Sequence, residues 1–174
     1  MKLFVGECFA WAQRAGWASE HVHEVAGVLS DTIGERAPIG LQYFLLDNML
    51  PSIPTPAVAP GATGTAELQP PELMVLLEPV FDLMGRASDE HTLQRAIRGV
   101  IDPLLDSASG AAEGGGGEGG EEGSNGGGGF SVDFAALSDR LFELAASKST
   151  RAYNRKALYA LQVLSRWSGR WSGR

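Results

Sequence analysis

The chain has little of what stabilises disulfide-rich or membrane-spanning proteins. Its 174 residues include one cysteine, Cys8, so no disulfide can form within the chain. A lone cysteine fits a reducing compartment such as the cytosol or nucleus. The sequence also lacks a run of about twenty apolar residues, the length that a helix needs to cross a bilayer. We therefore expect no membrane span.

Alternating patterns typical of β-strands are missing as well, and apolar residues recur at helical spacing instead. Val22, Val25, Leu29 and Ile33, for example, place one apolar stripe along a helix. The same reasoning predicts a succession of helices over residues 3–15, 19–33, 39–50, 71–84 and 88–103. The predicted fold class is all-α, an antiparallel helical array that is either HEAT-like or an orthogonal bundle.

Two prolines lie inside these patterns and modify the expectation. Pro79 should kink the fourth helix or divide it in two, because proline cannot donate the intrahelical hydrogen bond. Pro103 should end the fifth helix for the same reason.

Two low-complexity stretches divide the chain. Residues 51–70 form a proline-rich insert, which we expect to be flexible. Residues 106–129 are mostly glycine and glutamate, a composition that buries too little apolar surface to offset the entropy of ordering. The predicted organisation is a helical domain over 1–105, a flexible linker over 106–129, a helical hairpin over 130–168 and a tail over 169–174.

The C-terminal hairpin consists of two amphipathic patterns that meet at Ser149-Thr150. Asp133 is the expected N-cap of the first helix. Its expected apolar face consists of Phe134, Leu137, Leu141, Phe142, Leu144 and Ala145. The expected apolar face of the second helix consists of Leu158, Leu161, Leu164 and Trp167. Because the preceding linker is flexible, the hairpin is tethered and free to dock elsewhere than on the first helices.

Charge is distributed unevenly between the hairpin and the rest of the chain. The net charge is −7, yet the segment from Phe130 onward carries eight Lys or Arg against three Asp or Glu. Basic and aromatic side chains alternate on the second helix, a pattern that suits RNA backbone, an acidic protein partner or plain solvated surface. The predicted partner- or RNA-binding residues are Arg151, Tyr153, Asn154, Arg155, Lys156, Tyr159 and Arg166.

No set of residues predicts catalysis, a metal site or a cofactor. His21 and His23 are two residues apart, whereas a metal pair on a helix needs a spacing of three or four. The glycine run contains the pattern G-x-G-x-x-G, but no strand precedes it and no helix follows it directly. We therefore expect a protein that is not an enzyme and has no small-molecule substrate.

The hairpin also carries a family resemblance. The stretch RLFELAASKST, followed by NRKALY, resembles the C-terminal signature of the nucleolar ribosomal-RNA-processing protein 1 family. The matching residues are Arg140, Leu141, Phe142, Glu143, Ala145, Ser149, Thr150, Asn154, Arg155, Lys156, Leu158 and Tyr159. The resemblance implies a helical, nonenzymatic factor of ribosome biogenesis, which supports pre-rRNA processing by scaffolding within nucleolar preribosomal particles. Implied partners are preribosomal proteins and, through the hairpin, the pre-rRNA backbone.

Weaker similarity to the same family extends towards the N-terminus, at Gly16-Trp17, at residues 37–40 and at residues 78–81. The family's domain normally begins with several more helices, so the chain resembles its back half. We then expect the first helix to expose Phe4, Phe9 and Trp11. The alternative function is a generic helical-repeat adaptor for proteins outside ribosome assembly.

Overall fold

The protein is an array of α-helices, as the periodicity predicts. The computed structural model describes residues 2–34, 37–54, 67–110 and 130–171, and the predictions for the middle of the proline-rich insert and for residues 111–129 fall outside these ranges. In the described ranges the β-type pairing is limited to one isolated bridge between Leu68 and Phe130. The elements are α1 (Lys2–Arg14), α2 (Ser19–Ile33), α3 (Ile39–Asn48), η1 (Leu50–Ser52), α4 (Pro70–Arg86), α5 (Glu90–Ala96), η2 (Ile97–Ile101), α6 (Asp102–Gly110), α7 (Phe134–Ala146) and α8 (Ala152–Trp171).

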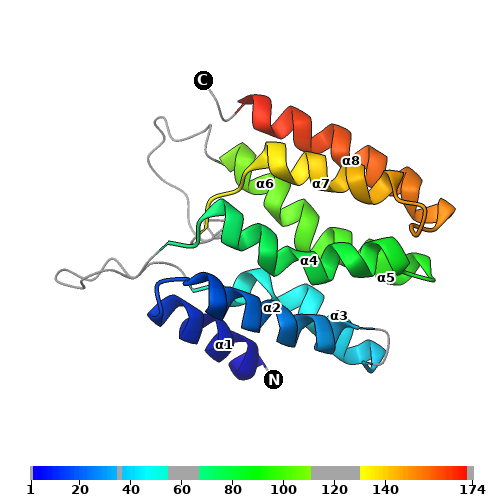
Figure 1. Ribbon diagram of the computed structural model, residues 1–174. Helices are drawn as coiled ribbons and strands as arrows, with labels where there is room; N and C mark the ends of the chain where they lie inside the picture. Colours follow the sequence, from blue (N-terminus) through cyan, green and yellow to red (C-terminus); the bar gives the residue numbers. More distant parts are fainter. Residues whose placement is uncertain (1, 35–36, 55–66, 111–129, 172–174) are drawn as a thin grey trace, which may run out of the picture.

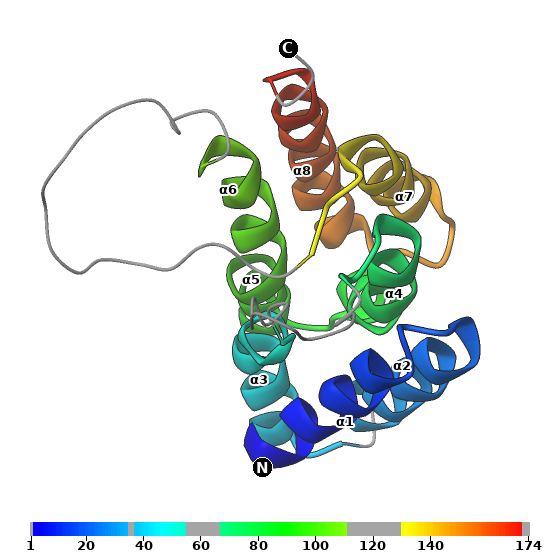
Figure 2. The same cartoon turned by 90° about the vertical axis from the view of Figure 1, so that its left-hand side faces the viewer.

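Helix α4 lies in the middle of the stack. Helices α1 to α3 lie on one side of it, and α6, α7 and α8 lie on the other, so that α1 and α8 are at opposite ends (Figure 1). Seen after a quarter turn, α4 lies between α2 and α7, and α8 lies between α6 and α7 (Figure 2). None of the helices in the described ranges is both long and apolar enough to span a membrane.

One hydrophobic core runs through the whole stack. Fully buried side chains come from every layer, including Val22 in α2, Phe81 in α4, Val100 in η2 and Leu137 in α7. The core therefore continues across the predicted boundary between residues 1–105 and 130–168. The hairpin of α7 and α8 docks on α4 and α6 rather than away from the first helices.

Neither of the two internal prolines ends a helix. Helix α4 runs unbroken from Pro70 to Arg86 with Pro79 buried inside it, so Pro79 does not divide it. Pro103 does not end a helix either, but lies in the first turn of α6, directly after the π-type turn η2. The first turn tolerates proline because its amide groups have no intrahelical acceptor, and the wider π-type turn gives the ring room.

Helix α1 buries one face and exposes another. Val5, Phe9 and Ala12 are buried, whereas Phe4 and Trp11 are 59% and 39% exposed. The exposure predicted for Phe4 and Trp11 is confirmed, and that predicted for Phe9 is wrong. Trp11 is not isolated, because its ring lies 4.4 Å from that of His21 on α2.

The apolar faces of the hairpin also need correction. Asp133 caps α7 as predicted, with its carboxylate accepting from the amides of Ala135 and Ala136. Phe142, however, is 51% exposed. On α8, Leu158 and Leu161 are buried as predicted, but Leu164 and Trp167 are 54% and 59% exposed. Polar side chains take their places in the core: Ser138, Asn154 and Ser165.

Candidate interaction site

Asn154 does not face solvent, so the sequence prediction that it contacts a partner or RNA is wrong. Its side chain is 1% exposed. Its amide nitrogen donates to the carbonyl oxygens of Met84 and Ala87 at 2.9 and 3.0 Å, and lies 3.3 Å from that of Gly85. The last carbonyl groups of a helix have no intrahelical donor. Asn154 thus supplies donors to the C-terminal end of α4 from a position far along the chain.

The connection between α7 and α8 lies directly against this end of α4. The amide of Arg151 donates to the carbonyl of Gly85 at 3.3 Å, and the hydroxyl of Thr150 donates to the carbonyl of Leu144 at 2.5 Å. A Cβ atom on Gly85 would lie 2.9 Å from Cδ1 of Leu144. Glycine at this position therefore allows α7 to approach α4 closely.

Arg155 is half-buried and holds the same connection. Its guanidinium donates to the carbonyl of Thr150 and to that of Ser147, both at 3.1 Å. Ser147 follows the last residue of α7, where a positive charge is favoured by the helix dipole. Two of the donors on Arg155 are thus used within the protein, which reduces what it can offer to an outside partner.

A bidentate ion pair joins α7 to α4. The guanidinium of Arg140 donates to both carboxylate oxygens of Glu78, at 2.8 and 2.6 Å, and lies over the ring of Phe81. The hydrogen bonds that Arg140 donates to the Glu78 carboxylate raise the pKa of Arg140 above its ordinary value. Both side chains are partly exposed, so this pair lies at the rim of the interface between the helices.

The other predicted site residues remain on the surface, namely Arg151, Tyr153, Lys156, Tyr159 and Arg166. The ring of Tyr159 meets that of Phe142 edge-on, with 6.0 Å between the ring centres. The hydroxyl of Tyr153 is hydrogen-bonded to the carboxylate of Glu90, which raises the pKa of Tyr153 above its ordinary value. These five side chains, and not Asn154 or the inward donors of Arg155, are available to a partner.

The sequence prediction also missed exposed apolar residues on α8. Ala160 and Val163 face solvent together with Trp167, at positions separated by three and four residues. The predicted apolar face follows spacings of three from Leu158 through Leu161 and Leu164 to Trp167, whereas Ala160, Val163 and Trp167 form a set with spacings of three and four on the exposed side of α8. Counting that second set is the signal that would have found these residues.

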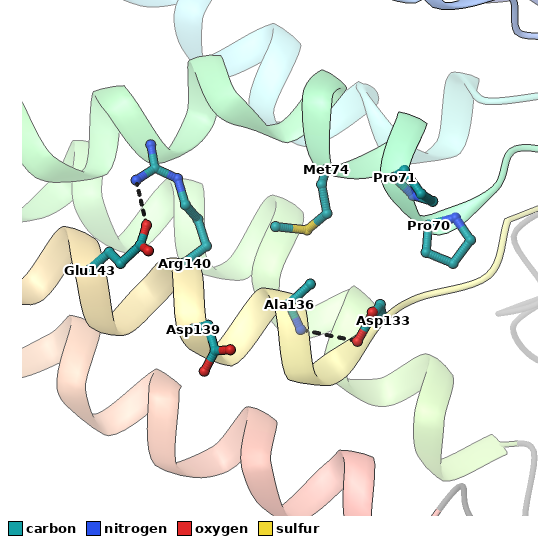
Figure 3. A pocket seen from close by; sticks show the side chains of 8 residues that line it. All are labelled: Pro70, Pro71, Met74, Asp133, Ala136, Asp139, Arg140 and Glu143. Atoms are coloured by element: carbon teal, nitrogen blue, oxygen red, sulfur yellow. Dashed lines mark hydrogen bonds and ion pairs between the residues drawn. The ribbon is translucent and has the colours of Figure 1, made fainter.

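A separate groove lies between the N-terminal turns of α4 and helix α7 (Figure 3). Its volume is about 360 Å³, and Pro70, Met74 and Ala136 supply apolar atoms to it. Of its ionic groups, Arg140 pairs with Glu78 of α4 and lies 3.6 Å from Glu143 of its own helix. The groove lies where α7 packs against α4. It brings together none of the predicted site residues.

In the described ranges, no group of three or more His, Cys, Asp or Glu side chains is placed to hold a metal ion. No protein-family model matches the chain, and comparison with curated proteins finds no match.

Proposed function

We propose that this chain is a nonenzymatic ribosome-biogenesis factor that acts in the nucleolus as part of preribosomal particles and supports pre-rRNA processing by scaffolding. Support comes from the resemblance of residues 140–159 to the ribosomal-RNA-processing protein 1 family. The observation that carries the proposal is the solvent-facing side of α8, where basic, aromatic and aliphatic side chains lie together on the outside of a closed core.

The residues that carry the resemblance divide into two groups. Thr150, Asn154 and Arg155 bind backbone carbonyls within the protein, so the fold alone accounts for them. Lys156 and Tyr159 belong to the same stretch but face solvent. The core does not require these two, and a binding function gives a reason for their presence.

The charge distribution also supports a binding role for the C-terminal side of the molecule. Seven of the fourteen Lys and Arg residues, and none of the twenty-one acidic residues, lie at or after Leu144. A continuous stretch of one sign attracts partners of the opposite sign. Acidic proteins and RNA in a preribosomal particle both meet this condition.

Sedimentation of a tagged copy tests the proposal. We expect the full chain from a cell extract to migrate on a sucrose gradient with fractions that contain pre-rRNA. Reversing two exposed charges, Arg151→Glu with Lys156→Glu, should move the protein to the top of the gradient. The matched control reverses Arg14 and Arg98, which are exposed on α1 and η2, and should still migrate with the particles. A wild-type signal confined to the top of the gradient contradicts the proposal.

A generic helical-repeat adaptor is the second candidate function. The observation that favours it is that Thr150, Asn154 and Arg155 bind backbone carbonyls within the protein. Two proteins that pack a hairpin on a helix in the same way would share these residues even if their functions differed. Microscopy of the tagged copy separates the two candidates. A nucleolar signal favours the assembly factor, and a diffuse cytoplasmic signal favours the adaptor.

A further inference from the structure

Helix α8 has two seams, which lie on opposite sides. The inner seam is buried, with spacings of 4, 3 and 4, and consists of Asn154, Leu158, Leu161 and Ser165. The outer seam faces solvent, with spacings of 3, 4, 3 and 4, and consists of Tyr153, Lys156, Ala160, Val163 and Trp167. Alternation of three and four is the repeat by which helices pack side by side. The inner seam is buried against other helices of this chain, whereas the side chains of the outer seam are exposed, with Tyr153 hydrogen-bonded to Glu90 of α5.

The outer seam exposes enough apolar surface to bind a helix. Tyr153, Val163 and Trp167 are 56%, 50% and 59% exposed. Between them, Ala160 leaves a gap into which a larger side chain of a neighbouring helix fits. From Tyr153 to Trp167 the seam is about 21 Å long, or about four helical turns. Contiguous apolar surface of this kind is typical of protein interaction sites.

Neighbouring residues widen the outer seam on both of its edges. Phe142 of α7, half exposed, touches Tyr159 on one edge, and Leu164 is 54% exposed on the other. The result is an exposed apolar strip along α8, flanked by Phe142 of α7, and amphipathic helices bind to partners through apolar surface of this kind.

Charge indicates what kind of helix would bind. The N-terminal end of the strip is mainly basic, with Lys148, Arg151 and Lys156 exposed near it against one carboxylate, that of Glu90, which is bonded to Tyr153. At the other end, Arg166 lines a hollow together with Asp139. A bound helix gains most when its own acidic residues lie opposite Arg151 and Lys156.

We infer that the outer seam of α8 binds an acidic amphipathic helix of a partner protein. This inference rests on the proposed scaffolding function and names the class of partner for the same face. The partner helix presents apolar residues at spacings of three and four to Ala160, Val163 and Trp167. Its carboxylates lie opposite the basic end of the strip.

The residues of the seam favour a protein over RNA. Single-stranded RNA is bound by basic side chains together with aromatic rings on which bases stack. Ala160 and Val163 in the middle of the strip, and Leu164 on its edge, have no ring. Arg155 and Asn154, which would add donors for phosphate, bind backbone carbonyls instead.

Fluorescence anisotropy with the full chain tests the inference directly. The probe is a labelled synthetic 21-residue peptide, built as about six helical turns, with leucine at alternating spacings of three and four and glutamate and alanine elsewhere. A peptide of the same composition, scrambled so that leucine no longer lies on one face, is the control. A single-stranded RNA of the same number of units is the competitor. We expect the amphipathic peptide to bind at least tenfold more tightly than the scrambled one, and the RNA not to displace it.

Matched variants of the protein locate the binding site. Val163→Glu should weaken peptide binding at least tenfold, because it places a carboxylate in the strip opposite an acidic ligand. Val28→Glu makes the same change on α2, at a side chain that is 41% exposed, and should leave binding unchanged. Both variants should melt within a few degrees of the wild type, since neither side chain is buried.

Several outcomes would overturn the inference. These are RNA that binds as tightly as the peptide, equal binding of the scrambled peptide, no binding of either peptide, and binding that survives Val163→Glu.

The sedimentation result distinguishes failure of this inference from failure of the proposed function. Peptide binding by a chain that stays at the top of the gradient supports the seam and contradicts the ribosomal function. Co-migration with particles by a wild-type chain that binds no peptide supports the ribosomal function and contradicts the seam.

Discussion

The two sides of α4 are packed in different ways. On one side α2 contributes an apolar stripe of Val22, Val25, Leu29 and Ile33. On the other side the hairpin adds directed polar contacts to its apolar ones, through Asn154 and through the ion pair of Arg140 with Glu78. Apolar burial is non-directional, whereas a hydrogen bond requires defined distances and angles.

This difference shows which contacts fix the position of a helix along its neighbour. An apolar stripe stabilises α2 against α4 but tolerates small shifts along the axis. The amide of Asn154 meets the terminal carbonyls of α4 in one position only, and so fixes the hairpin along α4. Polar groups inside an interface are known to specify one arrangement in some proteins, and we expect this for the hairpin side of α4.

The largest expected effect comes from removing the hairpin side altogether with Leu141→Asp. Leu141 is fully buried, so the substitution buries an unpaired carboxylate and should cost about 4 kcal/mol of unfolding free energy or more. Urea unfolding followed by circular dichroism measures the loss. Phe142→Asp introduces the same charge one residue away, on an exposed side chain, and should change stability by less than about 0.5 kcal/mol. Equal effects of the two variants would show that the hairpin does not dock as described.

The next effect comes from Asn154→Ala, which removes the donors but leaves the hairpin's apolar contacts. Buried carbonyl groups at the end of α4 then lose their partner, at a cost of about 3 kcal/mol. Asn154→Asp keeps the size of the side chain but replaces donors by acceptors, and should be at least as destabilising. Hydrogen exchange should show faster opening of α7 and α8 than of α2. A uniform change over all helices would argue against a local role for Asn154.

On the apolar side, Ile33→Val should cost about 1 kcal/mol, the usual loss for one buried methylene group. We expect hydrogen exchange to speed up evenly, without a change in the order in which helices open. Ser30→Ala, at an exposed position of the same helix, is the control for changes in helix propensity. Selective opening of the hairpin in Ile33→Val would remove the contrast between the two sides.

The smallest expected effect comes from Arg140→Met, which cuts the ion pair at the partly exposed rim. We expect a loss of about 0.5 to 1 kcal/mol that shrinks as salt is added, because water and ions already screen the pair. Stability is measured by urea unfolding at low and high salt. A loss that is insensitive to salt would indicate that the packing of Arg140 on Phe81 matters more than its charge.

The helical class and most buried stripes could be predicted from the sequence. The stripe of α2 and the cap at Asp133 depend on neighbouring residues alone, so periodicity and local chemistry suffice to find them. The sequence left open whether Pro79 kinks the helix or divides it, because the packing that decides between the two comes from residues far along the chain. The docking of the hairpin could not be predicted either, because the glycine-rich segment says nothing about where its ends come together.

In the candidate site too, features that depend on local chemistry could be predicted, and those that depend on distant residues could not. Side chains such as Lys156 and Tyr159 were predicted to be on the surface from their chemistry, and they lie there. Asn154 was misplaced because its acceptors lie 67 to 70 residues earlier in the chain. Val163 and Trp167 were missed because an apolar residue on an amphipathic helix is ordinarily assigned to the core. A helix with two seams breaks that rule.

The π-type turn η2 lies between α5 and α6 and sets how far the side chains of α6 are rotated relative to those of α5. Residues before it contact α3 and α4, and residues after it contact α8. Gly99, within the turn, lies so close to α3 that a Cβ atom would be 2.5 Å from the carbonyl oxygen of Leu46. The wider turn takes up one extra residue, which corresponds to a rotation of about 100°. Removing one residue there would turn Leu104 and Leu105 away from the hairpin. The turn thus rotates the side chains after it relative to those before it. The helices on its two sides can therefore pack against different neighbours.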